Sequence, residues 1–200
     1  TTPIVARWSQ AIAQTDLPAI LPLQLCGGAY CLPYTIDGQP FRAVVDTGSP
    51  FVLVDGTCDA ADVVTARTAA RTSVWGCYRG QGKPSGLGDT DELFGGEDVG
   101  VEWRRGDLVL QQIKQDELLR MTASVNDATF GVVRSYVGKG GGGAVFLGFA
   151  KRRLPRIRPT LLEQTDVRAL RFEFLQRRMY LSRSNLIPRS ADALHLVDLR

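Results

Sequence analysis

The sequence predicts a mainly β fold with a few short helices, and three observations support this prediction. Short apolar runs recur along the chain, and Gly, Pro or Asp separates them at the spacing of β-hairpins. Hydrophobic residues make up 44% of the 200 residues, which is enough for one domain with a substantial core. Every apolar run is far shorter than the ~20 residues that a membrane-spanning helix needs. We therefore expect one soluble or peripherally attached domain.

The chain divides into an N-terminal arm (1–21), one lobe (22–185) and a C-terminal tail (186–200). Helical spacing at 5–14 predicts a helix in the arm, and the alanine-rich segment 60–72 predicts a helix or an ordered loop. Glycines and acidic residues between Trp75 and Gly100 predict turns around an exposed hairpin. The remaining expected elements are strands at 21–25, 31–37, 41–46, 51–56, 128–133 and 144–150, two strands around a turn at Arg105-Gly106-Asp107, a short helix within 158–167, and a hairpin over 170–182 that turns at 176–178.

Four cysteines, Cys26, Cys31, Cys58 and Cys77, allow three disulfide connectivities, and the sequence alone does not choose among them. One connectivity joins Cys26 to Cys31 and Cys58 to Cys77, in an oxidising compartment such as the extracellular space, a vesicle or an organelle lumen. The alternative is four free thiols in a reducing compartment. No C-x-x-C occurs and the only histidine is the distant His195, so we expect no metal site and no cofactor.

Residues 41–56, FRAVVDTGSPFVLVDG, place Asp46, Thr47, Gly48 and Ser49 between two apolar arms. An acid beside a glycine between such arms is suited to hold one carboxylate at the tip of a buried turn. Together with the residues from Tyr34 onward, this segment resembles the active-site turn of the pepsin and retroviral-type aspartic proteases. The resemblance implies a single pepsin-like lobe with a β-barrel-like acid-protease fold. It makes Asp46 the catalytic carboxylate, with Thr47, Gly48 and Ser49 around it.

The resemblance continues in order over about residues 22–183. The segment CYRGQGKPSGLGDT resembles the glycine-rich flap that closes over substrate in this family, which implies a substrate-binding role for Tyr78, Gly80 and Gly82. Residues 130–150 resemble the family's later strands, and Gly148 would then pack behind the catalytic turn. Residues 158–182 resemble the helix and hairpin that close the lobe.

Several departures from the family pattern bear on function. Leu53 stands at the family's tryptophan position, Pro50 replaces a small polar residue, and the flap reads Tyr-Arg-Gly. No second Asp-Thr-Gly or Asp-Ser-Gly occurs, because Asp37-Gly38 and Asp55-Gly56-Thr57 lack the pattern. Aspartic proteases need two carboxylates that share one proton around one water. A single Asp46 therefore requires a second chain for catalysis.

Each functional interpretation has a structural alternative. Asp46 is then a structural turn acid, and Tyr78 is a core or surface tyrosine. The glycine-rich run 138–143 lacks the Ser or Thr of a phosphate loop, and Gly80-x-Gly82 lacks the dinucleotide-binding spacing. The basic stretch 151–158 lacks interleaved aromatic residues, so we expect no nucleic acid. It is a solvated face or a docking face for an acidic partner, with docking candidates Lys151, Arg152 and Arg153.

Three functions remain open from the sequence. The first is an aspartic endopeptidase that cuts an extended peptide and is active only when a homodimer or heterodimer supplies the second Asp. The second is a catalytically inactive single-lobe pseudoprotease that serves as an accessory or scaffold subunit of a larger complex, for example in an organelle lumen. The third is a module that binds peptides in the half-cleft without cutting them.

Overall fold

The computed structural model describes residues 18–57, 74–80, 82–94, 97–113, 123–137, 145–150, 158–184 and 186. Within these residues the chain forms twelve β-strands, one 3-10 helix and two helical residues at 74–75, so the mainly β prediction is confirmed. Several predicted features lie outside the described residues: the helices at 5–14 and 60–72, Cys58, the run 138–143, the docking candidates Lys151, Arg152 and Arg153, and nearly all of the tail. No helix in the described segments is long and apolar enough to cross a membrane.

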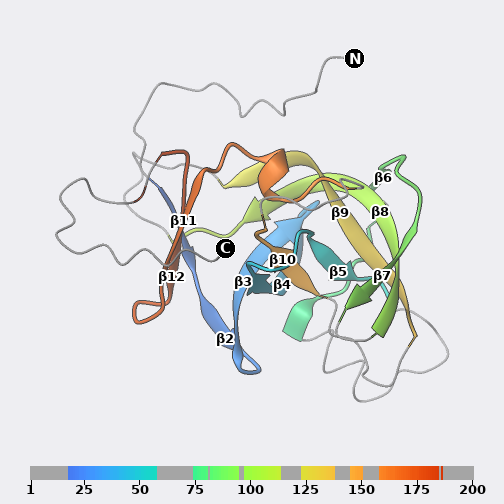
Figure 1. Ribbon diagram of the computed structural model, residues 1–200, viewed down its shortest axis with the longest axis horizontal. Coiled ribbons are helices and arrows are strands. Elements are labelled where there is room, and N and C mark those ends of the chain that lie inside the picture. Colours follow the sequence, from blue (N-terminus) through green and yellow to red (C-terminus); the bar gives the residue numbers. More distant parts are fainter. Residues whose placement is uncertain are drawn as a thin grey trace, which may run out of the picture.

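The strands form a small and a large sheet, which lie side by side in Figure 1. The small sheet is antiparallel, in the order β1 (Ala19–Pro22), β12 (Arg178–Ser182), β11 (Ala169–Glu173). The large sheet follows the path β10 (Phe146–Gly148), β4 (Gln39–Asp46), β3 (Ala29–Ile36), β8 (Glu97–Leu110), β9 (Ser124–Val137), β5 (Leu53–Asp55). Three short strands pair beside this path: β2 (Gln24–Cys26) with β3, and β6 (Lys83–Pro84) and β7 (Thr90–Phe94) with β8.

The path of the large sheet closes on itself next to the Asp46 turn. A bridge from Val52 to Leu147 links the residue just before β5 back to β10, the first strand of the path. The strand β10 therefore lies between the chain that enters the turn on β4 and the chain that leaves it toward β5. Two of the pairings in this region are parallel, β10 with β4 and β5 with β9.

The core holds β4 in place through alternate side chains. Leu32, Tyr34 and Ile36 of β3 are buried, as are Phe41 and Ala43 of β4, which matches the two-residue period of a strand. The Tyr34 and Phe41 rings lie 5.6 Å apart between centroids. Burial of each large apolar side chain stabilises the fold by about 1.5–3 kcal/mol. This packing anchors the strand whose last residue is Asp46.

The predicted turn at Arg105-Gly106-Asp107 is wrong, because β8 continues through these residues as one strand. A register shift between Gly106 and Leu108 takes the place of the turn, as a β-bulge does. The glycine makes room for a distant carboxylate, since a Cβ on Gly106 would lie 2.5 Å from Oδ2 of Asp37. The backbone N–H of Asp107 donates to Oδ1 of the same Asp37 at 2.8 Å. The bulge therefore depends on a long-range partner.

The short helix and the hairpin predicted near the end of the chain both form. The 3-10 helix η1 (Leu162–Gln164) lies within the predicted 158–167 segment. Thr160 and Glu163 form a capping box at its start. The Thr160 N–H donates to Oε2 of Glu163 and the Glu163 N–H donates to Oγ1 of Thr160, each at 3.1 Å. The β11–β12 hairpin also forms, but its turn spans residues 174–177 and so begins two residues earlier than predicted.

Candidate functional site

Asp46 ends β4, and the next three residues hold its carboxylate in a fixed orientation. The backbone N–H of Gly48 donates to Oδ1 at 2.8 Å, and the Ser49 hydroxyl donates to Oδ2 at 2.5 Å. Each carboxylate oxygen thus accepts one hydrogen bond from its own turn. Asp46 is only partly buried, so the carboxylate keeps access to solvent. The predicted residues Asp46, Gly48 and Ser49 therefore meet at one point, with Thr47 between them.

The strand β10 supports this turn from behind. Gly148 is the parallel partner of Asp46, and its N–H donates to the Phe51 carbonyl at 2.9 Å. The N–H of Phe149 donates to the Asp46 carbonyl at 2.8 Å, and the N–H of Ala150 donates to the Ser49 carbonyl at 3.0 Å. These bonds join both sides of the turn to a single strand. The expectation that Gly148 packs behind the Asp46 turn is thereby confirmed.

Gly148 has no room for a side chain. A Cβ at this position would lie 2.5 Å from the carbonyl oxygens of both Ser49 and Phe51, and 2.7 Å from the Phe51 nitrogen. All three neighbouring atoms belong to the backbone, so no side-chain rotation relieves the clash. A glycine is therefore required where the turn crosses β10.

The exit of the turn is anchored by an aromatic pair. Phe51 is buried and meets Trp103 of β8 edge-on, with ring centroids 4.9 Å apart. Leu53 is fully buried in the same cluster. The Pro50 carbonyl accepts a hydrogen bond from Leu161 at 3.4 Å, just ahead of η1. The turn therefore has defined contacts on both sides.

A carboxylate held in this way can accept a proton or position a water molecule. No hydrogen bond or ion pair joins a second carboxylate to Asp46 in the described parts of the chain. Within those same residues, no cluster of three or more His, Cys, Asp or Glu side chains forms a metal site.

Tyr78, Gly80 and Gly82 lie together in a second turn, separate from the first. The Gly82 N–H donates to the Tyr78 hydroxyl at 2.8 Å, and the Tyr78 N–H donates to the Asp55 carbonyl at 2.8 Å. The Tyr78 ring is buried and meets Phe130 edge-on at 5.3 Å. Burial raises the pKa of Tyr78, although the hydrogen bond from Gly82 acts in the opposite direction. The ring thus packs in the core here, and its flap role stays a prediction.

Asp55-Gly56-Thr57, which lacks the Asp-Thr-Gly pattern, nevertheless forms a second carboxylate turn that was not predicted from the sequence. Asp55 is only 4% exposed, and its Oδ1 accepts bonds from the Thr57 backbone N–H at 2.8 Å and the Thr57 hydroxyl at 2.7 Å. An acid followed by a glycine and a hydroxyl directly after a strand was the available signal. The order of these residues differs from Asp-Thr-Gly, so the pattern alone did not select them.

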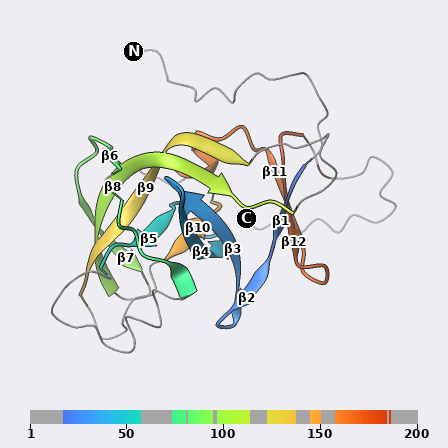
Figure 2. The ribbon, with the colours of Figure 1, turned by 180° about the vertical axis from the view of Figure 1, so that it is seen from behind.

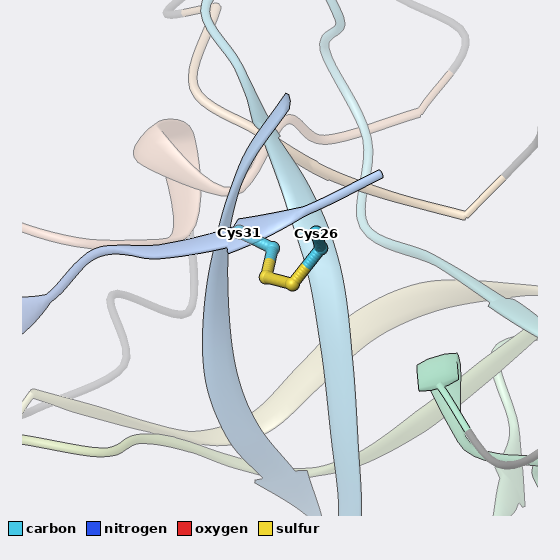
Figure 3. The surroundings of a disulfide bond; sticks show 2 residues. All are labelled: Cys26 and Cys31. Atoms are coloured by element: carbon cyan, nitrogen blue, oxygen red, sulfur yellow. A yellow bond between two sulfur atoms is a disulfide. The ribbon is translucent and has the colours of Figure 1, made fainter. Parts of the chain in front are cut away.

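One of the two expected disulfides is confirmed. Cys26 and Cys31 are bonded across the β2–β3 hairpin, with Cα atoms 6.0 Å apart (Figure 3). Cys77 is also disulfide-bonded, and its expected partner Cys58 lies outside the described residues. A disulfide in the hairpin is compatible with an oxidising compartment.

A groove of about 940 Å³ lies on the outer face of β3, β4 and β8. Its lining includes Pro33, Thr35, Arg42 and Val109, which alternate along their strands with buried residues. Arg79 of the Tyr78 turn contributes a second arginine. None of residues 46–49 line this groove. The groove and the Asp46 turn are therefore separate features of the molecule.

No protein-family model matches the chain, and no curated protein matches it either.

Proposed function

We propose that this chain is a single pepsin-like lobe of the aspartic-protease type, and that it acts as an endopeptidase when two lobes bring two carboxylates together. The observation that carries the proposal is the crossing at Gly148. An oriented, solvent-accessible Asp46 lies on a turn whose two sides are both bonded to one supporting strand. A simple hairpin turn needs no such support.

The mechanism follows from two facing Asp46 carboxylates. Like charges so close cannot both ionise, so the pair shares one proton. The ionised carboxylate takes a proton from a bound water, which attacks the peptide carbonyl, while the protonated carboxylate supplies a proton to the carbonyl oxygen. The hydrogen bonds from Gly48 and Ser49 fix the direction of each carboxylate toward the shared water. The substrate is an extended peptide.

The second candidate function is a pseudoprotease subunit of a larger assembly, and one observation favours it. The Tyr78 ring packs in the core, whereas a flap tyrosine must reach over substrate. In this function the Asp46 turn is a structural element, and its carboxylate performs no chemistry.

The experiment that separates these functions is cleavage of a mixed library of unstructured peptides, measured from acidic to neutral pH. The variant is Asp46→Asn, which keeps the shape of the side chain and removes the base. The matched control is Asp98→Asn, because Asp98 is an exposed carboxylate on β8. The peptidase predicts acidic cleavage that only Asp46→Asn abolishes. Absence of cleavage by a wild-type dimer at every pH contradicts it and supports the scaffold.

A further inference from the structure

Two hairpin tips project from the same side of the molecule. One is the β2–β3 turn at Gly27-Gly28, and the other is the β11–β12 turn at residues 174–177. Both tips point toward the lower edge in Figure 1 and again in the reversed view of Figure 2. Large apolar side chains gather on these two tips.

The apolar side chains form one contiguous patch across the two tips. Leu25 and Tyr30 are directly opposite each other in the β2–β3 pairing, so they share a face of that hairpin. The Tyr30 ring stacks on Phe174 at 5.0 Å, and Phe174 stacks on Phe172 at 5.7 Å. Leu175 follows at the very tip. We call these five residues the hairpin-tip patch.

Three members of the hairpin-tip patch are strongly exposed. Leu175 is 97% exposed, Leu25 is 56% exposed and Phe174 is 54% exposed. Scattered exposed apolar residues are normal on a protein surface, but a contiguous patch marks an interaction site. Tyr30 and Phe172 pack against the core beneath, so the exposed members rest on a fixed aromatic base. The patch is therefore preformed.

Positive charge borders the hairpin-tip patch. Arg177 is the last residue of the β11–β12 tip and Arg178 begins β12, and neither forms an ion pair within the described residues. The nearest acid in sequence, Glu173, is already paired with Arg171 at 3.0 Å and accepts a hydrogen bond from the Tyr180 hydroxyl at 2.8 Å. Residues 24–30 carry no charged side chain. The tips thus present apolar residues together with a surplus of positive charge.

Folding of the β11–β12 turn does not require a leucine at position 175 or an arginine at position 177. Arg177 has φ of 51°, a conformation that Gly or Asn adopts more easily. Polar residues and glycine dominate such turns, and nothing in the fold buries the Leu175 side chain. The tip therefore carries an exposed leucine and an arginine where a turn built only for folding would carry Gly, Asn or Ser.

We propose that the hairpin-tip patch docks the protein on an anionic phospholipid surface. Leu25, Phe174 and Leu175 enter the boundary between headgroups and acyl chains, and Arg177 and Arg178 contact the lipid phosphates. Shallow apolar insertion combined with basic side chains is how proteins bind reversibly to such surfaces. Each arginine near an anionic surface contributes about fivefold to the partition coefficient.

The shape of the patch favours a lipid surface over a protein partner. A stable protein–protein contact buries about 1,200–2,000 Å² across two complementary faces. Two narrow projecting tips offer a few side chains at the end of each hairpin, which suits insertion into a soft planar surface. The groove of β3, β4 and β8, which has a concave lining, contains none of the patch residues.

The experiment is flotation of the full chain with vesicles of two compositions, phosphatidylcholine alone and phosphatidylcholine mixed with phosphatidylserine. The first variant is Leu175→Ser, and its matched control is Leu93→Ser on β7, another strongly exposed leucine at 70%. The second variant is Arg177→Gln, with Lys83→Gln on β6 as its control, because Lys83 is also exposed. Thermal unfolding of each variant checks that the fold is intact.

The proposal predicts binding to the mixed vesicles and little binding to phosphatidylcholine alone. Leu175→Ser should lower the partition coefficient about tenfold, and Arg177→Gln about fivefold, whereas both controls and Asp46→Asn bind as the wild type does. Absence of wild-type binding to the mixed vesicles overturns the proposal. Equal losses in Leu93→Ser and Leu175→Ser overturn it as well. A wild-type dimer that Leu175→Ser dissociates, without vesicle binding, identifies the patch as a contact between two copies instead.

Discussion

The molecule contains two carboxylate turns that follow the same local rule and differ in their surroundings. Asp46 and Asp55 each end a strand, and each accepts one backbone N–H from the residue two positions later and one nearby hydroxyl. Asp55 is buried, whereas Asp46 keeps solvent access and lies over β10. Hydrogen bonding within a turn is therefore insufficient to identify a reactive carboxylate. Asp55 also pairs with a parallel strand, β9. Exposure, and the bonding of both sides of the turn to one strand, therefore distinguish Asp46 from Asp55.

The largest expected difference between the two turns is in catalysis. Asp46→Asn should lower peptide cleavage at least about a thousandfold, the scale for loss of a catalytic group that acts as part of a unit. Its effect on the free energy of unfolding should be small, because Asn still accepts a hydrogen bond at its oxygen. Asp55→Asn should instead lower the free energy of unfolding by about 1–3 kcal/mol, the cost of a disturbed buried hydrogen-bonded group. The rate of peptide cleavage and the free energy of unfolding in denaturant are measured for Asp46→Asn and for Asp55→Asn. Equal loss of cleavage in well-folded samples of both would contradict it.

The contact between the Asp46 turn and β10 can be disrupted directly with Gly148→Ala. The added methyl group meets backbone atoms of Ser49 and Phe51. We expect the free energy of unfolding to fall by about 3 kcal/mol, the upper end for overpacking. Gly28→Ala is the matched control: its φ is +91°, but no atom lies within 4 Å of the added Cβ. It should cost only about 1–2 kcal/mol of backbone strain. Urea titration of both variants tests the difference, and equal midpoints would count against a rigid crossing.

The disulfide at the β2–β3 hairpin should have a smaller effect. Replacing Cys26 and Cys31 by Ser should cost about 2 kcal/mol of unfolding free energy, because the bond closes only a short loop in the unfolded chain. Cys31 pairs with Val44, two residues before Asp46, but the hydrogen bonds to the Asp46 carboxylate come from Gly48 and Ser49. Peptide cleavage per folded molecule should therefore not change. Unfolding by urea with and without a reducing agent provides the measurement. A loss of cleavage in the folded double variant would show that the hairpin influences the site.

The smallest expected effect comes from an ion-pair network between β8 and β9. This network lies beside the Asp55 turn, since a Cβ on Gly56 would be 3.1 Å from a guanidinium nitrogen of Arg134. Glu102 pairs with Arg104 and Arg134. Burial raises the pKa of Glu102, but hydrogen bonds from Arg134 and Arg104 outweigh it and lower the pKa below 4.5. The network therefore stabilises the fold above the unfolded pKa, and this contribution is lost as the pH falls through the folded pKa.

Glu102→Gln measures the contribution of this network. It should lower the free energy of unfolding at neutral pH by about 0.5–1 kcal/mol, the scale of a part-exposed ion pair. The difference from the wild type should vanish in acid, where Glu102 is protonated in both states. Urea unfolding at neutral and acidic pH gives the two values. A difference that persists unchanged in acid would show that packing, and not charge, is responsible.

The sequence predicted the features of this fold that depend on neighbouring residues. The short run at 31–37, set off by Gly and Asp at hairpin spacing, predicted β3, and the interrupted run around Asp46 predicted its turn. The errors involve residues whose partners lie far along the chain. Gly106 suggested a turn because its partner, the Asp37 carboxylate, is distant in sequence.

The burial of Tyr78 also depends on distant partners. It results from contacts with Phe41 and Phe130, which the local pattern around Tyr78 does not contain. The same limit applies to Asp55, whose burial follows from the pairing of β5 with β9. Candidate residues could therefore be selected from the sequence, whereas the burial and the contacts of their side chains could not be predicted from it.

The central claim is that catalysis needs Asp46 from two chains, and mixing wild-type chain with Asp46→Asn tests it most directly. Total protein is held constant while the wild-type fraction varies, and cleavage is measured at acidic pH after the subunits exchange. Activity should fall as the square of the wild-type fraction, because random pairing in an equal mixture leaves about a quarter of the dimers with two Asp46 carboxylates. A linear fall with the wild-type fraction would contradict the account, because each chain would then act alone.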